Sequence, residues 1–184
     1  MQDNDWQVFS ERVSYEDRLH LACATLDGVW DEKRQAEVRE RNLHVLATLD
    51  SLEERRGDID EESPLVQELA RIDNKLNVLM DIVTRLLVPE SILPARQRIR
   101  LNATGALVSS DLVPQANGPL LLRLHIDACR ALPLELPVRQ HPGADQGSTF
   151  LVFESLGEAV NDGLERFVFR HHRRKVAEAR QSLT

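Results

Sequence analysis

The chain of 184 residues has few cysteines, no long hydrophobic run and an acidic beginning. No apolar stretch approaches the roughly 18 residues that a membrane-spanning helix needs, so we expect no membrane insertion. The residues from Met1 to Trp6 lack the apolar segment of a signal peptide, which argues against export and predicts a cytoplasmic protein. Cys23 and Cys129 stand far apart, and we expect two buried thiols rather than a disulfide.

The sequence also lacks the motifs of common enzymes and metal sites. It has no phosphate-binding loop, no dinucleotide-binding glycine pattern, no GxSxG and no HExxH. It has no CxxC and no histidine and cysteine cluster with zinc-ligand spacing. We therefore expect a protein that is not an enzyme, with no catalytic residues, no metal and no cofactor.

The most informative feature that is present is a heptad stripe between Ser63 and Val88. Its apolar residues recur at alternating intervals of four and three, at Leu65, Leu69, Ile72, Leu76, Leu79, Val83 and Leu86. This spacing places the apolar residues along one edge of a helix, where they can face a partner helix. An isolated helix of this length is only marginally stable in water, so this edge must be buried. If Leu69 and Leu76 take the a positions of the heptad, Ile72 and Leu79 take the d positions. Leucine at a with isoleucine at d favours trimers or tetramers. We expect a self-associating helix, in preference to one that packs on its own domain.

A second helix is expected before this stripe, from Asp31 to Gly57. Its inward positions follow the same spacing, at Val38, Asn42, Val45, Leu49 and Leu52. A turn at 58–62 then leads to Ser63 as N-cap and Pro64 as first helical residue, and Pro89 ends the second helix. The two helices are expected to form an αα-hairpin. Asn42 falls at an a position, where it either fixes the register of a coiled coil or is a surface asparagine.

Most of the remaining sequence has the pattern of short β-strands. They are expected at about 17–25, 96–102, 105–109, 120–126, 134–140 and 149–154, with a last helix over 155–180. A lone strand is not stable, so the first strand should pair with the later ones and the helices should be an insertion. We predict an α+β fold: a small antiparallel six-stranded β-barrel with an inserted long helical hairpin (coiled coil) and a C-terminal helix. The boundaries are 1–30, 31–88, 89–154 and 155–184.

The charge is unevenly distributed. The net charge is -7, which argues against a nucleic-acid partner. Residues 27–62 hold twelve acids and six Lys or Arg, whereas residues 166–180 hold six Lys or Arg and one acid. The basic end is interpreted as a solvated helix face or a complement to the acidic helices, and a polyanion-binding surface is the less favoured alternative.

One segment resembles a motif of a known family. Arg100-Leu-Asn-Ala-Thr-Gly105 is similar to the (D/N)xSxxG turn of PilZ domains, which are bacterial receptors for cyclic di-GMP. Gly105 matches the glycine, Asn102 stands in place of the serine, and Arg100 stands in place of the acidic or amide residue. The family's RxxxR motif is not matched at Arg12, although Arg96 to Arg100 spells it.

Two longer stretches, 63–83 and 164–174, resemble the atypical PilZ branch, in which an inserted helical hairpin forms a coiled-coil homotetramer. The resemblance implies a signalling adaptor with a protein partner in motility or virulence. Direct cyclic di-GMP binding stays open, because the motifs are degenerate. If the nucleotide binds, the resemblance and a pairing of the first two strands imply contacts from Arg12, Arg18, Arg98, Arg100, Asn102 and Gly105.

Overall fold

The computed structural model describes residues 2–26, 28–54, 64–116, 118–141 and 147–181. The helices are α1 (Gln2–Glu11), α2 (Glu32–Glu54), α3 (Pro64–Leu87) and α4 (Glu158–Gln181), and three single-turn helices are η1 (Glu90–Ile92), η2 (Ser110–Leu112) and η3 (Asp127–Cys129). The strands are β1 (Tyr15–Thr25), β2 (Arg96–Leu101), β3 (Gly105–Ser109), β4 (Leu120–His125), β5 (Leu134–His141) and β6 (Ser148–Phe153). All six predicted strands and the three predicted helices are confirmed. The predicted turn at 58–62 and the Ser63 cap lie outside the described residues.

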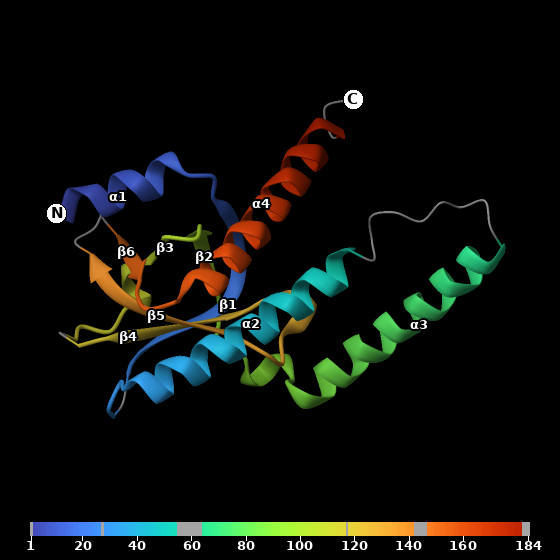
Figure 1. Ribbon diagram of the computed structural model, residues 1–184, viewed down its shortest axis with the longest axis horizontal. Coiled ribbons are helices and arrows are strands. Elements are labelled where there is room, and N and C mark those ends of the chain that lie inside the picture. Colours follow the sequence, from blue (N-terminus) through green and yellow to red (C-terminus); the bar gives the residue numbers. More distant parts are fainter. Residues whose placement is uncertain (1, 27, 55–63, 117, 142–146, 182–184) are drawn as a thin grey trace.

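The strands close into an antiparallel barrel in the order β1-β2-β3-β6-β5-β4 (Figure 1). β1 closes it, since its first half pairs with β2 and its second half pairs with β4. The prediction that the first strand joins strands from beyond the helical insertion is therefore confirmed. The barrel fold class, with its insertion and C-terminal helix, is also confirmed.

Alternating side chains of these strands fill the barrel. Leu101, Leu122 and Leu136 are fully buried, and Ile99 and Leu124 are equally inaccessible. Both cysteines are free thiols, with Cys129 buried and Cys23 half-buried. Burial raises the pKa of the Cys23 thiol to about 11. Burial also raises the pKa of Cys129, although a backbone hydrogen bond from Leu132 partly opposes this.

Helix α2 lies on the barrel rather than against α3. Val38, Val45 and Leu49 are buried, and the helix packs on α4, β5 and η3 (Figure 1). Its regular apolar spacing therefore reflects packing on its own domain.

Asn42 shows why α2 is fixed in this position. Its side chain is fully buried, its Nδ2 donates to the carbonyl oxygen of Glu135 at 2.7 Å, and its Oδ1 accepts from the Glu135 N–H at 2.8 Å. The amide thus satisfies both backbone groups of one β5 residue, as a neighbouring strand would. Both sequence interpretations of Asn42, a coiled-coil register residue and a surface residue, are therefore wrong.

Helix α1 is an element that the sequence analysis did not predict. Phe9 is fully buried, and its ring lies 4.7 Å from that of Phe150 on β6, measured between centroids. The Trp6 ring completes this cluster, at 5.6 Å from Phe9 and 5.4 Å from Phe150. α1 is therefore anchored to the barrel by aromatic packing.

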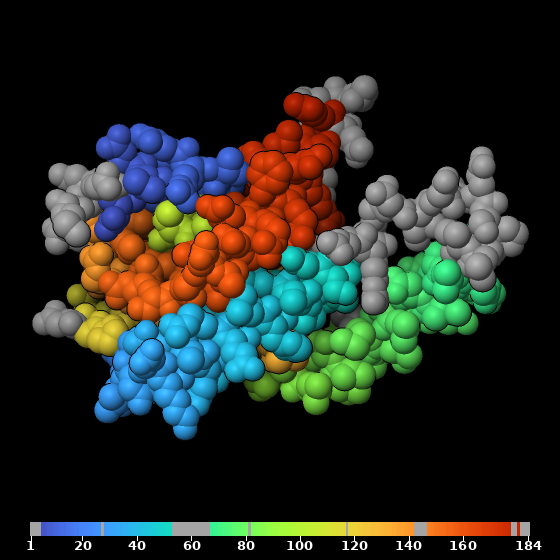
Figure 2. Space-filling model, in the orientation of Figure 1, coloured from blue at the N-terminus to red at the C-terminus, as the bar shows by residue number. Residues whose placement is uncertain are grey.

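Helix α3 extends away from the barrel (Figures 1 and 2). None of its side chains that the structure describes is buried. The chain re-enters the barrel through η1 and β2, where Nδ1 of the buried His20 lies 2.7 Å from the carbonyl oxygen of Pro94. The base of α3 is thus attached to β1, while its length is exposed.

Candidate functional site

Two surfaces carry the residues that the sequence singled out: the outer face of β1 and β2 with the turn that follows β2, and the length of α3. On the first surface, Arg18 is directly opposite Arg98, and Glu16 is opposite Arg100. The pairing that the sequence required for these arginines to approach one another is present. Arg12 is the exception, because it precedes β1 and points to α4.

The arginines on this face differ in how many contacts their side chains make with other residues of the chain. Arg98 is 83% exposed, and its Nη2 lies 3.5 Å from Oε2 of Glu16. Arg18 is also exposed. Two unlike-charged side chains at this exposure interact weakly, so Arg98 is available to an anionic ligand.

Arg96, at the other end of β2, has a structural role. Its guanidinium donates to both carboxylate oxygens of Asp127, at 2.7 and 3.1 Å, and to the carbonyl oxygen of Arg18 at 2.9 Å. Partial burial alone would raise the pKa of Asp127, but the hydrogen bonds and charge of Arg96, helped by Arg130, hold that pKa below its usual value. This bidentate pair ties β2 to η3.

The Arg100 side chain contacts α1 and the linker that follows α1. Its Nε donates to Oγ of Ser14 at 2.9 Å, and its Nη2 lies 3.5 Å from the carbonyl oxygen of Ser10. Its guanidinium carbon stands 5.3 Å from the centre of the Phe9 ring. The end of α1 therefore occupies the space where this arginine could meet a ligand.

The turn after β2 is fully used within the chain. Asn102 is 1% exposed, and its Oδ1 accepts from the N–H and hydroxyl of Thr104, at 2.8 and 2.7 Å, and from the N–H of Gly105 at 3.3 Å. Its Nδ2 donates to the carbonyl oxygen of Phe9 at 2.9 Å. The amide thus shapes the turn and docks α1, and its burial keeps it out of reach of a nucleotide at the surface.

Gly105 has a packing role. A Cβ at this position would lie 2.5 Å from the carbonyl oxygen of Leu151 and 2.6 Å from Cε2 of Phe150. Only glycine lets β3 approach β6 this closely. The matched glycine of the motif is therefore explained by the barrel itself.

Arg12 lies on the far side of the turn, in a cavity of about 390 Å³ between the α1–β1 linker and α4. Its Nη1 donates to Oε1 of Glu165 on α4 at 3.0 Å. Asn102 and Ala103 also line this cavity. The six expected ligand residues therefore do not form one pocket: Arg18 and Arg98 share a face, whereas Arg12 lies beside the turn.

The second surface is the heptad stripe on α3. Six of its seven residues have described side chains, and these are 46–75% exposed: Leu69, Ile72, Leu76, Leu79, Val83 and Leu86. Met80 and Ile82, which flank the stripe, are 52% and 48% exposed. Leu65 lies in α3, but its side chain is not described. A contiguous apolar face of this length on a soluble helix marks a place of association.

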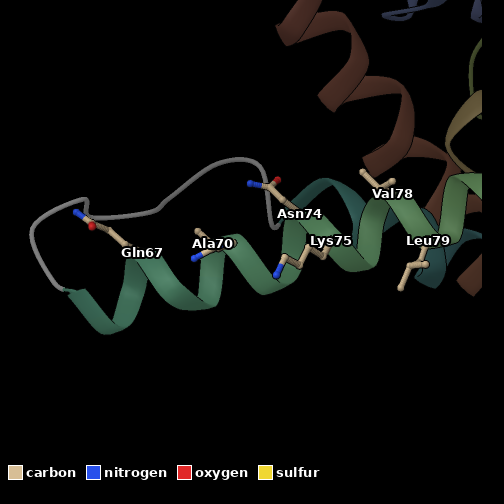
Figure 3. A pocket seen from close by; sticks show the side chains of 7 residues that line it. Gln67, Ala70, Asn74, Lys75, Val78 and Leu79 are labelled. Carbon is tan, nitrogen blue, oxygen red and sulfur yellow. The ribbon is translucent and has the colours of Figure 1, made fainter.

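The side of α3 outside the stripe borders a groove of about 970 Å³ (Figure 3). The groove is lined mostly by positions outside the stripe, such as Gln67, Ala70, Asn74 and Val78. Val78 and Leu79 leave the helix in opposite directions in Figure 3. Leu79 belongs to both surfaces, so the stripe and the groove meet at this residue, while most of the groove lies on another side of α3.

Across the described residues, no group of three His, Cys, Asp or Glu side chains is arranged to hold a metal ion. Within the same ranges, no helix has both the length and the hydropathy required to cross a membrane.

The fold defines a class: a closed six-stranded barrel with helices inserted after its first strand and a further helix packed on that insertion. The family model of the atypical PilZ domain, cyclic di-GMP receptor, matches residues 43–181, and the chain belongs to this family. The resemblance noted in the sequence is thereby confirmed. The comparison with curated proteins gave no match.

A solved structure with the same fold is a pathogenic protein from Xanthomonas campestris, described as a new tetrameric PilZ domain self-assembled via an unusual helical bundle. The two chains are 24% identical, with 95% of this chain and 96% of the other covered, at a TM-score of 0.68. At this identity the likeness establishes the fold.

Proposed function

We propose that the protein is a non-enzymatic cytoplasmic signalling adaptor whose chains assemble into a homotetramer through α3 and present four barrels to a protein partner. The observation that supports this is the exposed heptad stripe. Burying one leucine is worth about 1.5–3 kcal/mol, so a stripe of six exposed residues is a large unsatisfied apolar surface for a single chain.

Four chains fit the stripe better than two. Leucine at a with isoleucine at d favours trimers or tetramers, and the exposed flanks at Met80 and Ile82 widen the apolar face beyond a two-helix seam. The tetrameric helical bundle described for the Xanthomonas protein agrees with this assembly. α3 is also free along its length to enter a bundle, because the barrel is attached only at its base.

Light scattering coupled to size-exclusion chromatography tests the assembly. We expect the mass of four chains for the native protein and of one chain for the double variant Ile72→Glu and Leu79→Glu, since charges placed in an apolar seam oppose burial. Val78→Glu is the matched control, because Val78 is 59% exposed on the same helix but lies outside the stripe. A single-chain mass for the native protein, or equal dissociation in the control, would refute the proposal.

A second candidate function is direct binding of cyclic di-GMP, as the family description suggests. The observation that favours it is the exposed cross-strand pair of Arg18 and Arg98, since guanidinium groups bind phosphates well. Against it, Arg100 is bound by the α1–β1 segment, and the Asn102 amide is buried beneath α1. We therefore propose the ligand-free scaffold as the main function.

Isothermal titration of the tetramer with cyclic di-GMP separates the two functions. The scaffold predicts no heat at high ligand concentration. If heat is observed, Arg18→Ala and Arg98→Ala should each weaken binding, because these two arginines face each other across β1 and β2, and unchanged affinity in both variants would place the nucleotide elsewhere. Light scattering on the same samples verifies that the variants keep the native mass.

A further inference from the structure

A second exposed stripe runs along the length of α4. α4 buries Val160, Leu164 and Phe167 against its own domain, and its later part extends beyond the barrel (Figure 1). On the opposite side, residues follow one another at intervals of three and four: Arg166, Phe169, Arg173, Val176 and Arg180. Arginine and apolar residues alternate, so each type repeats every seven residues.

The apolar members of this stripe are accessible. Phe169 is 54% exposed and Val176 is 37% exposed. The guanidinium carbon of Arg173 lies 5.9 Å from the centre of the Phe169 ring, so the cation is stacked on the aromatic face. A stacked guanidinium keeps its edge free to bind a carboxylate, which places a charged site directly beside an apolar one.

The stripe borders the cavity described above. Phe169 is at the rim of this cavity of about 390 Å³, and Ala103 and Val168 provide apolar lining. The charges of Arg12 and Glu165 in this cavity offset each other, because the two side chains form a salt bridge. The cavity can therefore take an apolar side chain from a molecule that lies along α4.

The charge of this region identifies the kind of partner. Residues 166–180 hold six Lys or Arg and one acid in a chain of net charge -7. Arg166 and Arg170 both contact Asp50 of α2, which confirms that part of the basic end complements an acidic helix. Arg173 is stacked on the Phe169 ring, and it lies at the centre of the exposed stripe.

From these observations we infer that the outer face of α4 binds an acidic amphipathic helix of a partner protein. A helix matches the three-and-four spacing, apolar residues on it cover Phe169 and Val176, and its carboxylates meet the arginines between them. The apolar residues interleaved with the arginines favour a protein helix over a nucleic acid. The inference rests on the proposed adaptor role for the existence of a partner, but it uses no residue of α3.

The probe is a fluorescent synthetic peptide of about three heptads, helical in design, with leucine and glutamate at the positions facing α4. Fluorescence anisotropy is measured on the full-length native assembly. We expect saturable binding that weakens as salt is raised, and about tenfold weaker binding when serine replaces the peptide's leucines or lysine replaces its glutamates.

Variants of the protein locate the surface. Phe169→Ser and Arg173→Glu should each weaken peptide binding by about tenfold, because each removes one of the two kinds of contact. Arg98→Glu is the matched control, since it reverses an exposed arginine on the barrel, and it should change the affinity less than twofold. Circular dichroism and light scattering verify that every variant keeps its fold and mass.

The possible results separate this inference from the assembly proposal. The Ile72→Glu and Leu79→Glu double variant should lose its tetramer mass yet still bind one peptide per chain. Absence of peptide binding, equal binding by the variants, or preferential binding of a single-stranded oligonucleotide would overturn the α4 inference. A change of mass in Arg173→Glu would show that a second copy covers this face, which would also overturn it.

Discussion

Replacing Asn42 with alanine should destabilise the barrel, because this amide holds α2 on β5. The substitution removes a donor at 2.7 Å and an acceptor at 2.8 Å and leaves both backbone groups of Glu135 without that partner. Each buried backbone group without a partner costs about 1–3 kcal/mol. The higher helix propensity of alanine returns about 0.7 kcal/mol at most. Taken at the middle of these ranges, the expected net loss is about 3 kcal/mol.

Urea unfolding followed by circular dichroism measures this loss. With a slope of about 2 kcal/mol per molar urea, the midpoint should fall by about 1–2 M. The native protein and its variants must be compared at one chain concentration, because assembly adds to apparent stability. Asn74→Ala is the matched control: Asn74 is an exposed asparagine on α3, and the same substitution there should change stability by less than about 0.5 kcal/mol.

A leucine at position 42 separates the structural explanation from the coiled-coil one. In a coiled coil, leucine at this a position should raise stability and could change the number of chains. On β5 it leaves the Glu135 backbone without partners and should destabilise like alanine. An Asn42→Leu variant that is more stable than the native protein would refute the reasoning.

Three further outcomes are expected. Gly105→Ala should lower the free energy of unfolding by about 1–3 kcal/mol in urea titrations, because its Cβ would lie 2.5 Å from the carbonyl oxygen of Leu151. Asp127 has a lowered pKa in the fold, so its pairing with Arg96 stabilises the protein above the unfolded pKa of about 3.9. This stabilisation is lost as the pH falls through the pKa of Asp127 in the folded protein. Asp127→Asn should therefore reduce the acid sensitivity of the melting temperature. Cys23, with a pKa of about 11, should react with iodoacetamide at pH 8 far more slowly in the folded protein than in urea.

Each of these outcomes has a contrary result. Unchanged unfolding of Gly105→Ala would mean that β3 and β6 can separate without loss. Equal acid sensitivity in the Asp127→Asn variant would show that other carboxylates dominate. Equal alkylation rates for Cys23 in native and unfolded protein, measured in a Cys129→Ala background, would show that the thiol is not protected by burial.

The sequence predicts the strands and the two large inserted helices well because their apolar residues repeat with a clear period. Periodicity shows that a face is covered, but it does not identify what covers it. That is why Asn42, which follows the same spacing as the stripe on α3, is interpreted from the sequence as either a coiled-coil register residue or a surface asparagine, although it packs on β5. The partner of a helix depends on contacts between residues that are distant in the sequence.

The candidate site was less predictable for the same reason. β1 and β2 do pair as the arginines required, and Arg18 does face Arg98. No sequence pattern indicates that Arg100 is engaged by α1, since Trp6 and Phe9 alone mark α1 as a helix with a buried face. Their three-residue separation was the available signal, and Phe150, which completes the cluster, lies far along the chain.

The position of β1 has a consequence for how the chain is made. Thr25 pairs with Leu120, so about ninety-five residues must be synthesised before the strand can complete its second edge. At about 5–20 residues per second, β1 waits on the order of 5–20 s on the ribosome with Leu19 and Leu21 uncovered. The insertion therefore sets a minimum delay on barrel closure. Until β4 has been synthesised, the second half of β1 has no neighbouring strand to pair with.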